Sequence, residues 1–130
     1  METRVLIVDV DRKVHDRLSR ALSFTGALVF GASGGETALH QVKRVQPDLI
    51  ILDISSPDSE RWETLVEIRK LPYIPVIALT TPDDVNSIVE SLRHGADYSM
   101  TKPVRERELR ARIRALLRRS RQAASAQVAA

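Results

Sequence analysis

The sequence contains no cysteine among its 130 residues. Disulfide bonds, thiolate metal sites and thiol-based redox chemistry are therefore excluded for this chain. Because disulfides form in oxidising compartments, a chain without cysteine suits a reducing one, and we expect it to work in the cytoplasm.

Long hydrophobic runs are also missing. A membrane-spanning helix needs roughly 18 or more consecutive apolar residues, and no stretch approaches that length. The apolar segment Val5–Val8 near the N-terminus is too short for the core of a signal peptide, and no small-residue cleavage pattern follows it. We expect no membrane span, and we interpret this segment as a first β-strand.

Excess positive charge is confined to one stretch. Residues 105–121 contain eight arginines and two glutamates, giving +6, so the rest of a chain with net charge +3 carries −3. A mildly acidic body is a poor surface for nucleic acid, and we expect no direct nucleic-acid binding. Two interpretations of the basic stretch stay open: a solvated helix face, or a charged interface with a partner or a second copy.

What is present is an alternation of two kinds of segment. Short segments that are apolar nearly throughout have the pattern of strands buried on both faces, and they lie at Val5–Val8, Leu28–Phe30, Leu49–Leu52, Pro75–Leu79 and, more weakly, Tyr98–Thr101. The segments between and after them carry apolar residues at helical spacing. The alternation predicts an α/β fold: a doubly wound five-stranded parallel sheet in the flavodoxin-like order 2-1-3-4-5, with five helices.

Turn and cap signals mark the ends of these segments. Ser33–Glu36 has the spacing of a capping box, and Thr81–Asp84 offers an N-cap followed by Pro82 at the first helical position. Gly26 and Gly95 stand where helices should end. The local signals therefore agree with the alternation.

The composition changes at Ser120, after which small and polar residues dominate. We therefore expect a single domain over residues 1–119. Residues 120–130 are interpreted as a flexible tail or the start of an interdomain linker.

Polar side chains follow the predicted strands. Asp9 and Asp11 follow the first strand, Asp53 the third, Thr80 the fourth and Lys102 the fifth. Ligands of such sheets bind at the carboxyl ends of the strands. Each residue alone has an ordinary explanation as a helix cap or loop charge, but the set has the groups that phosphoryl transfer to a carboxylate requires: acids for Mg²⁺, an attacking acid, a hydroxyl and a cation.

Five motifs follow one another along the chain: Val-Leu-Ile-Val-Asp9, Ile-Ile-Leu-Asp53, Pro-Val-Ile-Ala-Leu-Thr80, Gly95-Ala-Asp97 and Thr-Lys102-Pro103. By their order and spacing, they closely resemble the response-regulator receiver domains of two-component signalling. The resemblance covers residues 4 to about 119.

The resemblance implies a role for each site residue. Asp53 would accept a phosphoryl group from a sensor histidine kinase. Mg²⁺ would be held by Asp9, Asp53 and the backbone carbonyl of Ser55, and the phosphoryl group by Thr80 and Lys102. The Lys102–Pro103 peptide bond would be cis. The domain would be a signalling module rather than an enzyme, with no chemistry beyond its own phosphorylation and dephosphorylation.

One departure from the family pattern concerns the metal site. The family usually places a second acid directly after the first, whereas this chain has Val10 there and Asp11 one residue later. Asp11 could substitute through a water, but a shift of one residue also redirects the side chain. We therefore expect Mg²⁺ to bind weakly.

Other departures concern signal transmission. The family's aromatic switch position, three residues before the lysine, is Ser99, and the neighbouring Tyr98 should point to the opposite face of its strand. Thr81 adds bulk where a small residue is common. Ser56-Pro57 and Glu60-Arg61 replace the family's landmarks after the phosphoacceptor. We expect the coupling between the site and the rest of the domain to be altered or absent.

Two alternatives stay open. The chain could be a degenerate receiver that binds partners without being phosphorylated. Alternatively, Asp9-Val-Asp11 resembles the nucleophile motif of haloacid-dehalogenase-like phosphatases, which would make the chain an enzyme with Asp9 as nucleophile. The short chain, the absence of a downstream acidic pair and the lack of a role for Asp53 argue against the phosphatase.

The arginine-rich last helix resembles that of receivers from winged-helix transcription regulators, which pair through their fourth helix, fifth strand and fifth helix. The resemblance implies a homodimer in which Glu90 and Asp97 face arginines across a two-fold axis. The candidate arginines are Arg110, Arg112 and Arg114. A DNA-binding output domain is expected to lie outside these 130 residues.

Overall fold

The computed structural model describes residues 2–23, 25–55, 60–81 and 84–129. Within them, five parallel strands form one sheet in the order β2-β1-β3-β4-β5. The strands are β1 Arg4–Val8, β2 Leu28–Ala32, β3 Leu49–Asp53, β4 Val76–Thr80 and β5 Tyr98–Thr101. The predicted fold class and strand order are confirmed.

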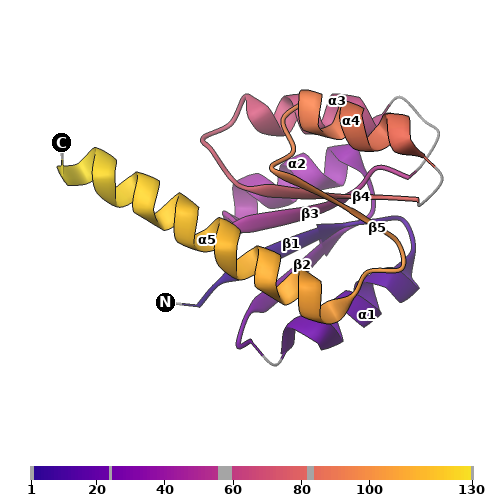
Figure 1. Cartoon of the computed structure of the whole chain (residues 1–130), viewed down its shortest axis with the longest axis horizontal. Coiled ribbons are helices and arrows are strands. Elements are labelled where there is room, and N and C mark those ends of the chain that lie inside the picture. Colours follow the sequence, from indigo (N-terminus) through magenta and orange to yellow (C-terminus); the bar gives the residue numbers. More distant parts are fainter. Residues whose placement is uncertain (1, 24, 56–59, 82–83, 130) are drawn as a thin grey trace.

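Helices cover both faces of this sheet. Their bounds are α1 Arg12–Ser23, α2 Gly35–Val45, α3 Glu60–Arg69, α4 Val85–Arg93 and α5 Glu106–Ala129. Figure 1 shows α1 and α5 on one face and α2, α3 and α4 on the other. The carboxyl ends of β1, β3 and β4 therefore open at one edge of a three-layered molecule.

The side chains of the strands alternate between two apolar clusters. In β1, Val5 and Ile7 pack against the α1 and α5 side, whereas Leu6 and Val8 pack against the α2 and α3 side. Burial on both faces explains why each strand reads as a nearly continuous apolar run. The two-sided core fixes the strand ends from which the polar residues emerge.

The predicted start of α2 is wrong by one residue. Gly34, not Ser33, is the N-cap, and its backbone N–H donates to the Thr37 hydroxyl at 3.1 Å. Glu36 lies in the first turn and takes no part in this cap. The hydroxyl of Thr37 thus performs the reciprocal bond that the capping-box spacing assigned to Glu36.

The predicted start of α4 needs a similar correction. Asp84, not Thr81, is the N-cap, because its carboxylate accepts the backbone N–H of Ser87 at 3.0 Å. Pro82, the predicted first helical residue, lies outside the described residues. Gly26 and Gly95 are confirmed as helix-ending residues, with φ of 76° and 110°.

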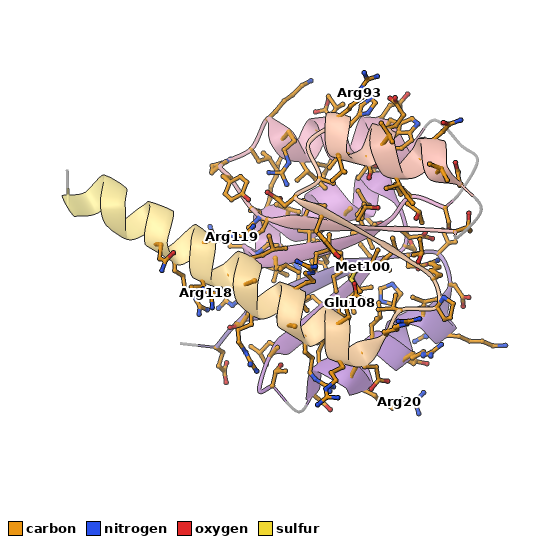
Figure 2. All side chains as sticks on the ribbon, viewed as in Figure 1. Arg20, Arg93, Met100, Glu108, Arg118 and Arg119 are labelled. Carbon is orange, nitrogen blue, oxygen red and sulfur yellow. The ribbon has the colours of Figure 1, made fainter. Side chains whose placement is uncertain are left out.

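Helix α5 continues to Ala129, whereas composition favoured an irregular tail. Alanine and glutamine, which recur after Ser120, are good helix formers, and this explains the difference. The second half of α5 extends beyond the sheet, and Figure 2 shows Arg118 and Arg119 on this part of the helix. The domain limit at residue 119 stays a prediction.

Among the described residues, no helix is both long and apolar enough to cross a membrane.

Candidate functional site

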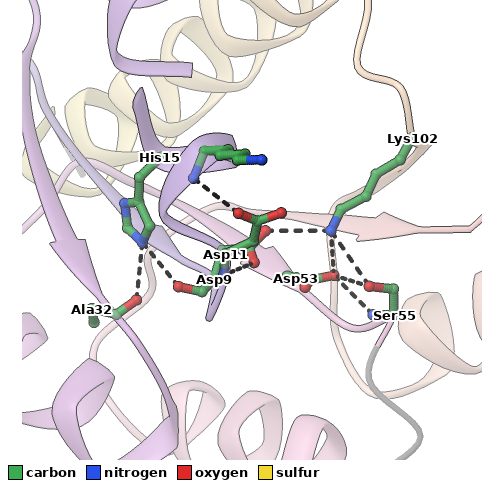
Figure 3. Close-up of polar contacts among 8 residues, drawn as sticks. Asp9, Asp11, His15, Ala32, Asp53, Ser55 and Lys102 are labelled. Atoms are coloured by element: carbon green, nitrogen blue, oxygen red, sulfur yellow. Dashed lines mark hydrogen bonds and ion pairs between the residues drawn. The ribbon is translucent and has the colours of Figure 1, made fainter. Parts of the chain in front are cut away.

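Three side chains from three segments meet at the carboxyl edge of the sheet (Figure 3). Asp9 follows β1, Asp53 ends β3 and Lys102 follows β5. The Lys102 ammonium lies 3.2 Å from Asp53 Oδ1 and 3.3 Å from Asp9 Oδ2. The structure thus brings two carboxylates and a cation, singled out from separate motifs, into one cluster.

Asp9 is the most deeply buried acid of the cluster, with 3% of its surface exposed. Its Oδ1 accepts the backbone N–H of Asp11 at 2.8 Å. Burial, together with the nearby charge of Asp53, raises the pKa of Asp9, although the hydrogen bond from Asp11 and the charge of Lys102 oppose the shift. A buried carboxylate of this kind gains from a bound cation.

Asp53 is held through one of its two oxygens. Its Oδ1 accepts the Ser55 hydroxyl at 2.6 Å and the Ser55 backbone N–H at 2.9 Å, and it is also the atom paired with Lys102. Within the described part of the chain, no hydrogen bond or ion pair uses Oδ2. The family resemblance implies a role for Ser55 through its carbonyl alone; the Ser55 hydroxyl, which also lies 3.4 Å from the Lys102 ammonium, was not predicted.

Thr80, at the end of β4, is 1% exposed, and its hydroxyl has no hydrogen-bond partner among the described residues. The backbone carbonyl of the same residue accepts the N–H of Lys102 at 2.8 Å, which ties the end of β4 to the segment after β5. The Lys102–Pro103 bond is cis, as the resemblance implied. A buried hydroxyl without a partner is costly, so an acceptor arriving beside it would be favoured.

Val10 and Asp11 do not add a carboxylate to the cluster. Val10 is 77% exposed and apolar. Asp11 is exposed, and its Oδ1 accepts the backbone N–H of Lys13 at 2.9 Å, as an N-cap of α1 does. Across residues 2–23, 25–55, 62–81 and 84–122, no three side chains of histidine, cysteine, aspartate or glutamate gather as a metal-ligand set.

The groups that remain still fit a weakly held Mg²⁺. Two carboxylates within 3.3 Å of one ammonium, on Asp9 and Asp53, are close enough to share a small cation. Hard oxygen ligands suit Mg²⁺, which keeps several waters and is commonly bound by one or two carboxylates. The carbonyl of Ser55 would be a third oxygen at the same edge.

Comparison with known proteins decides the family, because the model of the response regulator receiver domain matches residues 5–114. The chain belongs to this receiver family. The response regulator MprA of Mycobacterium leprae is 42% identical over 119 residues, which cover 91% of this chain and 52% of the relative. The chain spans about half the length of the curated relatives it matches.

Solved receiver structures have the same architecture. A CheY-like response regulator receiver domain protein of Methanospirillum hungatei JF-1 is 30% identical, with a TM-score of 0.84 over 94% of this chain and 98% of the other. A two-component response regulator of Clostridium difficile is 29% identical, also with a TM-score of 0.84, over 92% and 98% of the two chains. The chain is therefore a signalling domain of the two-component response regulators.

This receiver lacks an inward-facing aromatic on β5. Tyr98 packs on the α1 and α5 side, where the Arg112 guanidinium lies 4.1 Å from the ring centroid and the phenol donates to Glu108 at 3.3 Å. Ser99 takes the opposite face, and its buried hydroxyl has no hydrogen-bond partner among the described residues.

Thr81 follows β4 and is half-buried. Ser56, Pro57 and the side chains of Glu60 and Arg61 lie outside the described residues.

Asp97, one of the residues proposed for a dimer face of the receiver, has several partners within the chain. Asp97 is used within the chain, because its carboxylate accepts the N–H of Val76 at 2.7 Å and the Tyr73 phenol and pairs with Arg69 at 3.4 Å. A role of Asp97 in a contact between copies stays a prediction, and its carboxylate is 21% exposed. Internal partners could not be read from the sequence, since they come from α3, the segment after it and β4.

The arginines of α5 are also divided. Arg110 and Arg114 line a groove of about 690 Å³ between α5 and the end of α1, together with residues such as Leu22. Arg112 instead lies over Tyr98 of β5. The predicted arginines thus line two different surfaces of α5, and the dimer face itself stays a prediction.

Proposed function

We propose that Asp53 is the phosphoacceptor and takes its phosphoryl group from a sensor histidine kinase. The observation that carries the proposal is that the two oxygens of the Asp53 carboxylate differ. Ser55 and Lys102 contact Oδ1, which leaves Oδ2 as the oxygen available for attack. An electron pair of Oδ2 would form the new bond to phosphorus while the bond from phosphorus to the kinase histidine breaks. The departing imidazole nitrogen retains the electrons of that bond.

Lys102 and Thr80 would then stabilise the transferred group. The Lys102 ammonium already lies beside Oδ1, and it would pair with the negatively charged phosphoryl oxygens after transfer. The unpaired Thr80 hydroxyl can donate to one of those oxygens and so gain the hydrogen bond it lacks. This gain would bias the end of β4 toward the phosphorylated arrangement.

Mg²⁺ would neutralise charge between the acids and the incoming phosphoryl group, as it does in phosphoryl transfer generally. Asp9, Asp53 and the Ser55 carbonyl would hold it. Because Val10 supplies no carboxylate and Asp11 caps α1, we expect weak binding. A chain without cysteine suits the cytoplasm, where we propose that this exchange takes place.

We propose the α4, β5 and α5 side as the output face and as a contact between two copies. Helix α4 exposes Val85, Val89 and Leu92 at helical spacing, which forms an apolar stripe. Glu90 lies on the same helix, and Arg112 of α5 lies over Tyr98 of β5. Surface ion pairs contribute little individually, so the stripe would supply most of the affinity.

Sedimentation tests the contact between copies. The wild-type domain should become dimeric after phosphorylation, and Val89→Lys should stay monomeric with unchanged adduct formation. A wild-type domain that stays monomeric at high concentration in both states would contradict the dimer.

The output domain would belong to the half of the relatives' length that this chain does not span, and DNA binding would be its task, not that of the receiver.

A second candidate function is favoured by the same exposed Val10. A receiver that holds Mg²⁺ too weakly to be phosphorylated would act as a phosphorylation-independent binding module. Its partners would recognise the output face in the arrangement described here. The haloacid-dehalogenase alternative has no support in the geometry, because Asp11, its would-be acid and base, caps α1.

Intact mass after incubation with acetyl phosphate and Mg²⁺ separates these functions. The phosphoacceptor proposal predicts an adduct of about 80 Da that depends on Mg²⁺ and is missing in Asp53→Asn. If folded protein forms no adduct while a known active receiver is labelled in parallel, the phosphoacceptor proposal fails and the binding module is favoured.

A further inference from the structure

His15, in α1, hydrogen-bonds two backbone carbonyls beside the site. Its Nε2 lies 3.0 Å from the carbonyl oxygen of Asp9 and 3.2 Å from that of Ala32 (Figure 3). Both partners are acceptors, so Nε2 must carry the hydrogen. The N–H of Asp9 also donates to the Ala32 carbonyl, at 3.0 Å. These bonds tie together the ends of β1 and β2 and the helix between them.

The imidazole occupies space that a glycine leaves open. A Cβ on Gly31 would meet Cε1 of His15 at 2.8 Å and Nδ1 at 3.0 Å. Gly31 lies inside β2, where glycine is otherwise unfavourable because it loses more conformational freedom and has no side chain to pack. The close approach of the ring explains a glycine at this position.

These contacts fix both sides of the Asp9 backbone. Its N–H is bonded to β2 and its carbonyl to His15, which leaves the carboxylate directed at Asp11 N–H and Lys102. Val10 brings no second acid, so the segment after β1 offers the cluster a single buried carboxylate. The direction of that carboxylate therefore matters more than it would beside a second acid.

We propose that His15 is a positioning residue that, seated over Gly31, aims the Asp9 carboxylate at the cation and phosphoryl site. His15 touches neither metal nor phosphate; it acts through the main chain of Asp9. The inference rests on the proposed function for its consequence in phosphorylation. The orientation of the Asp9 carboxylate, however, can be tested without any phosphodonor.

Three substitutions at His15 separate positioning from packing. In His15→Gln the side-chain amide N–H can reach about as far as Nε2, in His15→Asn it stops short, and in His15→Ala no donor remains. The readouts are the Mg²⁺ dissociation constant by calorimetry, the backbone NMR signal of Asp11, whose N–H donates to Asp9, and the midpoint of urea unfolding. Mutation of a residue that hydrogen-bonds to a metal ligand commonly lowers metal affinity by roughly 10-fold or more.

We expect His15→Ala and His15→Asn to weaken Mg²⁺ binding about tenfold and to shift the Asp11 amide signal, while His15→Gln stays close to wild type. Gly31→Ala should reproduce the effect of His15→Ala by displacing the ring. In a His15→Ala background, the same Gly31→Ala change should have no further effect, because its clash is with the imidazole.

The inference is overturned if His15→Ala lowers the unfolding midpoint but leaves the Asp11 signal and the Mg²⁺ affinity unchanged, since His15 would then be purely structural. It is also overturned if Gly31→Ala acts equally with and without His15. If the wild type forms no phosphoryl adduct, the proposed function fails. The Asp11 signal still decides the role of His15 in that case.

Discussion

The ammonium of Lys102 lies 3.2 Å from Oδ1 of Asp53 and joins the segment after β5 to the end of β3. The Asp53 side chain is 9% exposed and that of Lys102 24%, so water screens this pair only in part. The same ammonium is 3.3 Å from Asp9. One cation thus pairs with two carboxylates, which leaves one negative charge in the cluster.

Lys102→Met keeps the apolar stem and removes the charge. The two carboxylates would lose their shared cation, and we expect the free energy of unfolding at pH 7 to fall by about 1–3 kcal/mol, measured by urea denaturation. Lys70→Met is the matched control, because Lys70 forms an exposed pair with Glu67 at 2.8 Å and its loss should cost less than about 0.5 kcal/mol. Equal losses in the two variants would contradict this assignment.

Asp9→Asn tests the cost of the buried charge. Burial raises the pKa of Asp9 above the unfolded value of 3.8. The stabilisation from this group is therefore complete below the unfolded pKa and is lost as the pH rises through the folded pKa. We expect the variant to be at least as stable as wild type at pH 7 without Mg²⁺, with a flatter dependence of stability on pH. A variant that is less stable at pH 7 yet equal at acid pH would refute the shift.

Val10→Asp restores the acid that the family usually has. Because position 10 is 77% exposed, a carboxylate there loses little hydration. We expect about tenfold tighter Mg²⁺ binding by calorimetry and faster adduct formation at low Mg²⁺. Val10→Asn, similar in size but uncharged, should change neither. If both variants behave alike, position 10 does not serve the cation.

Tyr73→Phe tests the cluster around Asp97. Burial, followed by the hydrogen bond to Asp97, raises the pKa of Tyr73 to about 12. The neutral phenol therefore stabilises the fold below about pH 10, and this contribution is lost as the pH approaches about 12. We expect the variant to lack this alkaline loss of stability. Tyrosinate absorbance in a Tyr98→Phe background, where Tyr73 is the sole tyrosine, should titrate above the ordinary value; a titration near pH 10 would contradict it.

The strands were predictable because they are buried on both faces and so form short apolar runs that no helix pattern matches. Helix starts were less predictable. At α2 the N-cap is Gly34 and not Ser33, and at α4 it is Asp84 and not Thr81. Such differences of one to three residues depend on geometry that the sequence does not display.

The main residues of the site could be located because strand ends meet at one edge of a parallel sheet, which places Asp9, Asp53 and Lys102 together. The bond from the Ser55 backbone N–H to Asp53 had a signal, since an aspartate side chain commonly accepts the backbone N–H two residues later in a turn. His15 had none, because its partners are backbone carbonyls of distant segments. The internal partners of Asp97 were hidden because they lie 21 to 28 residues earlier in the chain.

The central claim is that Asp53 carries the phosphoryl group, and chemical trapping tests it most directly. Borohydride reduces an aspartyl phosphate to homoserine, so peptide mass spectrometry after treatment with acetyl phosphate and Mg²⁺ identifies the modified residue. The account predicts homoserine at position 53. Homoserine at Asp9 or elsewhere, or none at all while a control receiver is modified in parallel, would contradict it.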